Sequence, residues 1–234
     1  MASSGTRKRR ERGSIVPEDI LAGAFAVAER DGLDNLSMPE LASHLGIGVT
    51  SIYWYFRSKD DLLRKMTDQA TTLLQDRLPT PTDWKPEEWQ EFLLAYFSTE
   101  RASHQDANVL TDLVLMRTSS YSIPSTHRVY RSVERVLAYL VEVGFAPRQA
   151  WQVFSALSLY TRGFIITERT RRVNQTPPLG SPQLSLIDVD TMPILTELIT
   201  HHSAMLDMAD DESFEFGVRL ALDQAARVLE GTTS

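Results

Sequence analysis

Residues 37–59 read SMPELASHLGIGVTSIYWYFRSK, and this stretch decides which fold we expect. It opens on Ser-Met-Pro-Glu, a capping box in which the side chains of Ser37 and Glu40 satisfy the first backbone N–H groups of a helix. Gly46 then ends that helix, because glycine adopts the left-handed conformation without steric cost. A second short helix, 49–55, follows the turn. Two short helices joined by a tight glycine turn predict a helix-turn-helix.

The second short helix carries hydroxyl, phenol and indole groups where a purely structural surface helix would carry ion pairs. Its size suits the major groove of DNA, where residues near the N-terminus of a helix reach the base edges. Lys59 follows the expected N-cap Ser58, and its charge is placed to meet a phosphate. We expect Ile47, Ile52 and Phe56 to face the core. The side chains that the helix presents belong to Val49, Thr50, Ser51, Tyr53, Trp54 and Tyr55.

The net charge is −7, yet positive charge is concentrated at the N-terminus. Residues 1–16 hold five basic side chains and one acidic one, whereas 17–77 hold 6 basic and 10 acidic, and 78–234 hold 13 and 20. DNA binding needs a locally positive surface rather than a positive total. We expect the arm to reach a minor groove or phosphates, with a solvated tail as the alternative when DNA is absent. The expected contacts are Arg9, Arg10 and Arg12.

Apolar residues recur with helical spacing along nearly the whole chain, and almost no stretch alternates as a strand does. We predict an all-α fold of nine or ten helices, with an N-terminal three-helix DNA-binding domain and a larger helical domain. The domain boundaries that we expect are a basic flexible arm at 1–16, a helix-turn-helix domain at 17–62, and a ligand-binding and dimerisation domain at 63–234. The first helix is expected to open at Pro17 and to end at Asp31-Gly32, and later helices are expected near 86–104, 107–117, 125–143, 147–171, 191–207 and 211–230.

The composition argues against several classes of protein. There is no cysteine, which excludes disulfide scaffolds, thiolate metal sites and cysteine nucleophiles. The five histidines include no pair with the i, i+4 spacing of a zinc helix, and we find no Gly-rich phosphate loop or nucleophile elbow. We therefore expect no catalysis, no cofactor and no metal. No membrane span or secretory signal is visible, so we expect a cytoplasmic protein.

Residues 46–63, GIGVTSIYWYFRSKDDLL, resemble the recognition-helix signature of the tetracycline-repressor (TetR) family of bacterial transcription regulators. The residues that fit the family pattern are Gly46, Tyr53, Tyr55, Phe56 and Lys59. The resemblance implies a recognition helix that includes Thr50, Ser51, Tyr53, Trp54 and Tyr55, with Lys59 on a phosphate.

Two of these positions have alternative interpretations. Ser37 either touches a phosphate or serves only as a helix cap, and Trp54 is either a DNA contact or a core residue. The family consists mostly of repressors, so we expect a ligand-responsive repressor that binds a palindromic operator as a dimer. The alternative is a helical protein-interaction adaptor without sequence-specific DNA binding. Steep salt dependence of DNA binding distinguishes the two.

The C-terminal part is similar to the tetracycline-repressor subgroup at 144–145 (GF) and at 213–217 (SFEFG). In that subgroup a His and a Glu help to hold a magnesium–tetracycline complex. The resemblance places Ser120 and Thr167 near those two positions, with Glu168 adjacent to the latter. Because the His has no counterpart here, we expect an effector other than tetracycline.

The helix expected near 147–171 is apolar on more than one face, so it must be covered on both sides. The last helix carries small residues that permit close approach. We expect these two helices to pair with their copies across a two-fold axis as a four-helix bundle. The residues expected to form it are Phe154, Ser158, Arg162, Phe214, Val218, Ala221, Leu222 and Ala225.

Aromatic residues of the larger domain are the candidates for an effector pocket. A mostly apolar pocket with a few hydroxyls suits a small, flat, lipophilic ligand. The alternative for each of these side chains is plain core packing. The candidates are Trp89, Phe92, Tyr96, Met116, Tyr121, Tyr130, Trp151, Phe154 and Tyr160.

Overall fold

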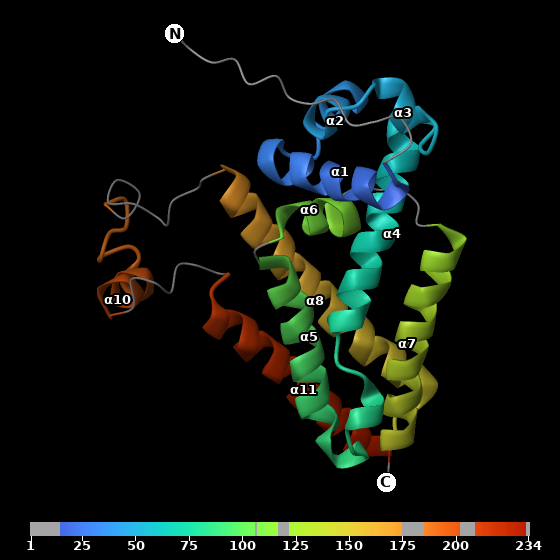
Figure 1. Cartoon of the computed structure of the whole chain (residues 1–234). Helices are drawn as coiled ribbons and strands as arrows, with labels where there is room; N and C mark the ends of the chain where they lie inside the picture. Colours follow the sequence, from blue (N-terminus) through green and yellow to red (C-terminus); the bar gives the residue numbers. More distant parts are fainter. Residues whose placement is uncertain (1–14, 106, 117–121, 175–184, 202–208, 233–234) are drawn as a thin grey trace. The chain divides into compact units, whose positions relative to one another are not determined.

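The computed structural model of the chain describes residues 15–105, 107–116, 122–174, 185–201 and 209–232 (Figure 1). All regular structure in these ranges is helical and none of it is a β-strand, so the prediction of an all-α fold is confirmed. The chain divides into two compact units. Unit 1 is formed by 1–77 with 107–131, and unit 2 by 78–106 with 132–234.

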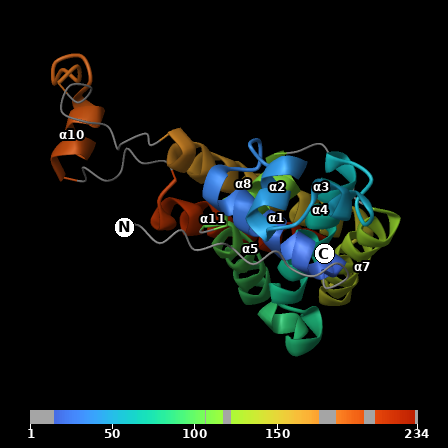
Figure 2. The ribbon, with the colours of Figure 1, turned by 45° about the horizontal axis from the view of Figure 1, so that its top comes forward.

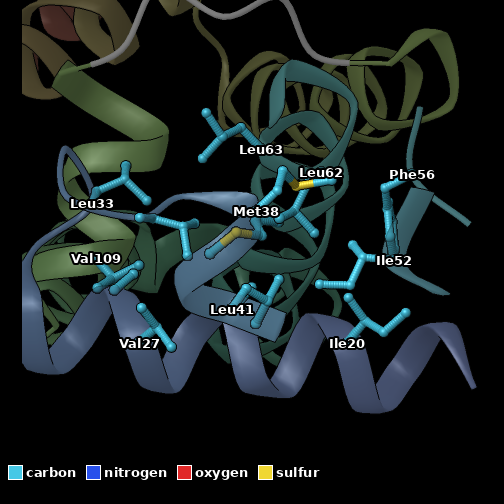
Figure 3. Packing of buried hydrophobic residues seen from close by; sticks show 14 of the residues in the cluster. Ile20, Val27, Leu33, Met38, Leu41, Ile52, Phe56, Leu62, Leu63 and Val109 are labelled. Atoms are coloured by element: carbon cyan, nitrogen blue, oxygen red, sulfur yellow. The ribbon is translucent and has the colours of Figure 1, made fainter. Parts of the chain in front are cut away.

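Unit 1 contains a helix-turn-helix and the helices that pack on it. Its helices are α1 (Pro17–Asp31), α2 (Met38–Leu45), α3 (Val49–Tyr53), α4 (Lys59–Arg77), α6 (Asn108–Thr111) with a π-helical turn at Asp112–Met116, and the first part of α7 (Ile123–Val143). Buried side chains from α1, α2, α3, α4, α6 and the connecting loops share one apolar core, and Figure 3 labels several of them, including Leu33 and Phe56 from the loops.

Helix α1 begins where the sequence predicts, at Pro17, and ends at Gly32, whose φ of 87° is unfavourable for other residues. Val16 is the N-cap in an extended conformation. The residue before it, Ile15, is buried in the same apolar cluster as Ile20. A buried apolar pair at these two positions is the pattern of a hydrophobic staple, which fixes the direction in which the chain enters the helix.

Unit 2 is built mainly from long helices around an aromatic core. It contains the second part of α7, together with α5 (Trp89–Gln105), α8 (Pro147–Asn174), α10 (Pro193–His201), α11 (Asp211–Thr232) and two 3-10 turns at Pro81–Asp83 and Pro86–Glu88. Helix α8 packs against both α5 and α11. The core includes Phe92, Phe97 and Phe145, each almost completely buried. A helix covered on two sides explains why α8 is apolar on more than one face.

Most of the described helices lie within about three residues of the predicted bounds, and the recognition helix is shorter than predicted. Helix α3 ends at Tyr53 rather than at residue 55, because the backbone tightens so that the N–H groups of Tyr55 and Phe56 both bond to the Ile52 carbonyl oxygen, at 3.0 and 2.9 Å. This turn brings Phe56 into the core. Helix α10 begins at Pro193, two residues after the predicted start at 191, and is described as far as His201; residues 202–207 of the predicted helix lie outside the described residues.

Candidate DNA-binding surface and effector region

The turn between α2 and α3 has the predicted geometry. Ser37 caps α2, with its Oγ accepting a hydrogen bond from the Glu40 N–H at 3.2 Å. In a complete capping box the Glu40 carboxylate would accept from the Ser37 N–H. Here it accepts from Arg30 Nη2 at 2.8 Å instead. Gly46 is left-handed (φ 67°, ψ 33°). Its N–H donates to the Ser43 carbonyl oxygen, and the Ile47 N–H donates to the Ala42 carbonyl oxygen. These bonds set the angle at which α3 leaves the turn.

The packing of α3 decides which of its side chains face outward. Ile52 and Phe56 are buried in the core of unit 1, and Ile47 is half-buried against it. The opposite side of the segment projects away from that core. Thr50 is exposed, and the exposed fractions of Tyr53, Trp54 and Tyr55 are 47%, 83% and 45%. Val49 and Ser51 are half-buried.

Trp54 is therefore a surface residue, and the alternative in which it belongs to the core is wrong. In Figure 2, α1, α2 and α3 lie beside one another in unit 1, in agreement with the contacts between them. Helix α3 contains no charged residue. The exposed surface formed by residues 50, 53, 54 and 55, which we call the α3 surface, is accordingly polar and aromatic rather than ionic.

Lys59 and Ser58 follow the α3 surface. Ser58 is the N-cap that the sequence predicts, since its Oγ accepts from the Asp61 N–H at 3.1 Å. The half-buried Lys59 donates from Nζ to the Asp34 carbonyl oxygen at 3.3 Å, which holds its ammonium group beside the loop before α2. The three predicted arm contacts, Arg9, Arg10 and Arg12, lie outside the described residues.

Replacing Gly46 with alanine is expected to destabilise the turn by about 1–2 kcal/mol, the cost of a left-handed conformation for a residue with a Cβ atom. Space is not the obstacle, because a Cβ atom at Gly46 would meet nothing within 4 Å. Gly48→Ala is the matched control, since Gly48 has an ordinary φ of −75° and equally open surroundings. Urea unfolding measures the free energy of unfolding of both variants. Equal stability of the two variants would contradict the assigned role of Gly46.

The predicted pocket residues do not form one site within either unit. Trp89, Phe92, Tyr96 and Phe154 are buried in the core of unit 2, and Tyr160 is half-buried against it. Trp151 is exposed on α8. Met116 and Tyr130 belong to unit 1 and are exposed, while Tyr121 lies outside the described residues. A groove of about 450 Å³ between α5 and α11 of unit 2 is lined by other residues, among them Gln90, Arg219 and Asp223.

The core of unit 2 also contains buried polar and titratable groups, of which the sequence analysis singled out only Tyr96. Tyr96, Glu100 and His104 follow one another at intervals of four along α5, and all three are buried. Burial raises the pKa of Glu100 to about 7 and that of Tyr96 to about 12, and it lowers the pKa of His104 to about 4. On α8, Thr161 is completely buried, and its Oγ1 has no hydrogen-bond partner among the described residues. The sequence signal that could have revealed Glu100 and His104 was their spacing of four residues along an otherwise apolar stripe of α5.

Arg101 joins three helices of unit 2. Its Nη2 lies 2.6 Å from Glu168 Oε1 and 2.8 Å from Asp211 Oδ1, and its guanidinium carbon lies 4.6 Å from the centre of the Phe214 ring. Glu168 stands next to Thr167, the position that resembles the family's ligand-binding Glu. Its carboxylate is already paired, so it stabilises the unit. Thr167 bonds back to the Gly163 carbonyl oxygen.

Most of the residues predicted to pair two chains lie inside unit 2 instead. Phe154, Phe214, Val218, Leu222 and Ala225 are buried in its own core, where a second chain cannot reach them. The reason is that α8 and α11 pack on each other and on α5 through these side chains. Ser158 and Ala221 are half-buried, and Arg162 is exposed.

A different apolar face of α8 and α11 is exposed. Leu159 is 71% exposed and Phe216 69%, and the other exposed apolar side chains of these helices include Trp151, Ile166 and Leu220. The spacings 151, 159 and 166 on α8, and 216 and 220 on α11, each follow one side of a helix. We call these five residues the α8/α11 apolar face.

The small residue Gly217 serves packing within the unit. A Cβ atom at Gly217 would clash with the Tyr160 hydroxyl, which itself donates to the Ser213 carbonyl oxygen at 2.8 Å. The close approach that was predicted for the small residues of the last helix is therefore made, at Gly217, to α8 of the same chain.

Among the described residues, no helix is long and apolar enough to cross a membrane. Within the same ranges, no group of three or more His, Asp or Glu side chains is placed to hold a metal ion.

An all-helical chain that presents a capped helix-turn-helix, with an outward polar and aromatic second helix, is a DNA-binding regulator of the helix-turn-helix class. Comparison with known proteins specifies the family. Residues 20–66 match the model of the bacterial regulatory proteins of the tetR family, and residues 81–226 match the tetracyclin repressor-like C-terminal domain. The chain belongs to the TetR family of transcriptional regulators.

Curated relatives and solved structures agree with this assignment. The HTH-type transcriptional repressor Rv1353c of Mycobacterium tuberculosis is 40% identical over 97% of this chain and 86% of its own length. The tetracycline repressor protein class E of Escherichia coli is 24% identical over 69% of this chain and 76% of its own. The structure of ActR from Streptomyces coelicolor in complex with actinorhodin superposes with a TM-score of 0.69 at 18% identity, covering 93% of this chain and 99% of ActR.

Proposed function

We propose that the protein is a cytoplasmic, homodimeric repressor that binds a near-palindromic operator and leaves it when a small lipophilic effector binds. The observation that carries this proposal is the α3 surface, where exposed side chains stand opposite the buried anchors Ile52 and Phe56. The similarity to a mycobacterial transcriptional repressor supports repression rather than activation.

The α3 surface supplies the base contacts in this proposal. Hydroxyl and phenol groups hydrogen-bond to base edges, and the Trp54 ring packs against apolar groups such as the thymine methyl. Lys59 supplies a phosphate contact through its ammonium group, and Ser37 serves chiefly as the cap of α2. The bases are read by Thr50, Tyr53 and Trp54, with Val49 and Ser51 at the edge of the contact.

The α8/α11 apolar face is the proposed dimer interface. Five large apolar side chains are exposed on two helices that pack on each other, and exposed apolar residues gathered in this way mark contacts with other proteins. Pairing of this face with its copy across a two-fold axis gives a four-helix bundle. A dimer of this kind places two recognition helices about 34–36 Å apart, one turn of DNA.

Leu220→Glu tests this interface. A carboxylate introduced into a closed apolar contact is expected to raise the dimer dissociation constant at least about tenfold, since an unpaired charge costs well over 1.4 kcal/mol to bury. Leu73→Glu is the control, because Leu73 is about equally exposed but belongs to α4. Sedimentation equilibrium measures the dimer dissociation constant of both variants. Dissociation of the Leu73→Glu dimer alone would place the interface elsewhere.

The effector is proposed to act on unit 2. The buried polar groups Glu100 and Thr161, together with the surrounding aromatic side chains, supply hydrogen-bonding groups in an otherwise apolar interior. The ActR structure holds actinorhodin, so flat aromatic molecules are the first class to test. An effector releases DNA only if it binds the DNA-free conformation more tightly, and a difference of about 1–3 kcal/mol relieves repression several-fold to about a hundredfold.

The experiment that tests the function is titration of the protein on its selected operator in the presence of a panel of lipophilic aromatic compounds. At least one compound is expected to weaken operator binding several-fold or more without dissociating the dimer. Operator affinity that stays flat over the whole panel would contradict the proposal of an effector of this class.

A further inference from the structure

Tyr53 and Tyr55 are exposed to almost the same extent on the α3 surface, but they differ in how their hydroxyl groups are bound. The Tyr55 Oη donates to the carbonyl oxygen of Ile15 at 3.0 Å, across 40 positions of sequence. The Tyr53 hydroxyl takes part in no hydrogen bond within the described part of the chain. A proton that is already donated to a carbonyl oxygen is not available to a base edge, so the two tyrosines have different roles.

The acceptor of this bond is a fixed point of unit 1. The Ile15 side chain is buried in the same cluster as Ile20. The carbonyl oxygen of the next residue, Val16, accepts from the N–H groups of Asp19 and Ile20 at 3.1 and 3.3 Å. The Ile15 carbonyl oxygen is therefore held at the start of α1, which itself packs against α2 and α4. The bond thus ties the segment that follows α3 to the helices that support it.

Helix α3 depends on tertiary contacts for its orientation. It is five residues long, and its N-cap, Gly48, makes no side-chain hydrogen bond. A helix this short is not stable by itself in water. Figure 3 shows Ile52 and Phe56 in the apolar core, with Ile52 beside Ile20 of α1. These two anchors fix how deeply the segment is seated in unit 1.

Apolar anchors alone define the rotation of α3 only weakly. Burial of apolar surface has no preferred direction, whereas a hydrogen bond weakens steeply when its angle departs from the favoured range. The Tyr55 side chain is exposed while Ile52 and Phe56 are buried, so its bond holds the segment at a point away from the two anchors. A bond at such a point opposes rotation. Recognition side chains need to be held within about 0.5 Å and 10–20° of their productive geometry.

We propose that Tyr55 is a positioning residue for base recognition, whose hydroxyl fixes the rotation of α3 through its bond to the Ile15 carbonyl oxygen. That rotation sets the direction in which Thr50, Tyr53 and Trp54 face the DNA. The inference rests on the proposed DNA-binding function and deepens it. It gives Tyr55 an effect on sequence specificity that acts through other side chains, without a contact between its own hydroxyl and the DNA.

Tyr55→Phe in the full chain tests this role, because it keeps the ring and removes only the hydroxyl. Affinity is measured for the selected operator, for operators with one base pair changed, and for a duplex of scrambled sequence, each across a range of salt concentrations. Tyr53→Phe and Lys59→Gln show the effects of losing a base contact and a phosphate contact. Tyr130→Phe, exposed on α7, is the neutral control. Thermal melts set a temperature at which every variant is folded.

Tyr55→Phe is expected to bind the selected operator about three- to tenfold more weakly, since one net hydrogen bond changes an equilibrium by roughly that factor. Its affinity for the scrambled duplex and its salt slope should equal those of the wild type, because phosphate contacts determine both. The loss should be spread over several base pairs. Tyr53→Phe should lose discrimination at one base pair, and Lys59→Gln should weaken binding to both duplexes with a slope reduced by about 0.9.

Three results overturn the proposal while the wild type still prefers its operator. An equal loss of affinity for both duplexes, with a shallower salt slope, would show that the Tyr55 hydroxyl contacts a phosphate. A loss confined to one base pair would show that it contacts that base. Unchanged affinity for every duplex would show that the bond to Ile15 does not position α3. A wild type that does not distinguish the operator from the scrambled duplex would instead refute the proposed function itself.

Discussion

Replacing Arg101 with methionine is expected to lower the free energy of unfolding by about 3 kcal/mol. The guanidinium group is nearly buried between α5, α8 and α11, where it pairs with Glu168 and lies over the Phe214 ring. Removing it leaves the Glu168 carboxylate, itself only 12% exposed, without its cation. Breaking a buried pair from one side costs about 3–5 kcal/mol, and the exposed Asp211 partner places this case at the lower end.

Arg219→Met is the matched control for this prediction. Arg219 also pairs with a glutamate, Glu215, but both side chains are more than half exposed on α11. A surface pair of this kind contributes less than about 1 kcal/mol. Urea unfolding of both variants measures the difference, and the combined Arg101→Met, Glu168→Met variant should recover part of the stability. Similar small decreases in Arg101→Met and Arg219→Met would show that Arg101 does not hold the three helices together.

Replacing Tyr53 with alanine is expected to weaken operator binding about 10- to 100-fold, which corresponds to roughly 1–3 kcal/mol for the removal of one base-reading side chain. Tyr53 is about half exposed, and the core below it is formed by Ile52 and Phe56 instead. The variant should therefore keep the thermal stability and the dimer of the wild type. Electrophoretic mobility shift or fluorescence anisotropy with the selected operator measures the change in affinity.

Tyr130→Ala provides the control for Tyr53→Ala, because Tyr130 is also an exposed tyrosine but lies on α7. It is expected to leave operator affinity unchanged in the absence of effector. If Tyr53→Ala bound the operator as tightly as the wild type while remaining folded, the assignment of the α3 surface to base recognition would be wrong.

Much of the fold was predictable from local sequence signals. Pro17, the cap at Ser37, the left-handed Gly46 and the cap at Ser58 each fix a helix end by a local rule, and the structure has all four where they were predicted. The burial of Ile52 and Phe56 followed from their spacing in the motif. These features depend on neighbours within four residues, which is why the sequence is enough to place them.

The residues of unit 2 were harder to assign, because α8 carries apolar side chains on more than one face. Periodicity shows that such a helix is covered on two sides, but not which side packs within the chain. Phe154 and Val218 were therefore predicted for a dimer interface, whereas both are in the core and Leu159 and Phe216 are exposed.

Long-range polar contacts left no local signal. The bond from Tyr55 to Ile15 joins residues 40 positions apart, and Arg101 meets Glu168 across 67. In the sequence, Tyr55 is indistinguishable from Tyr53, and Ile15 belongs to an arm defined by its charge. Only the tertiary fold shows that Ile15 is the buried end of that arm.

Selection of bound duplexes from a random pool by the full-length wild type tests most directly whether the α3 surface reads a specific DNA sequence. We expect enrichment of one near-palindromic sequence, with half-site centres about one DNA turn or a multiple of it apart. Recovery of DNA with no enriched sequence, from a folded protein, would contradict the claim.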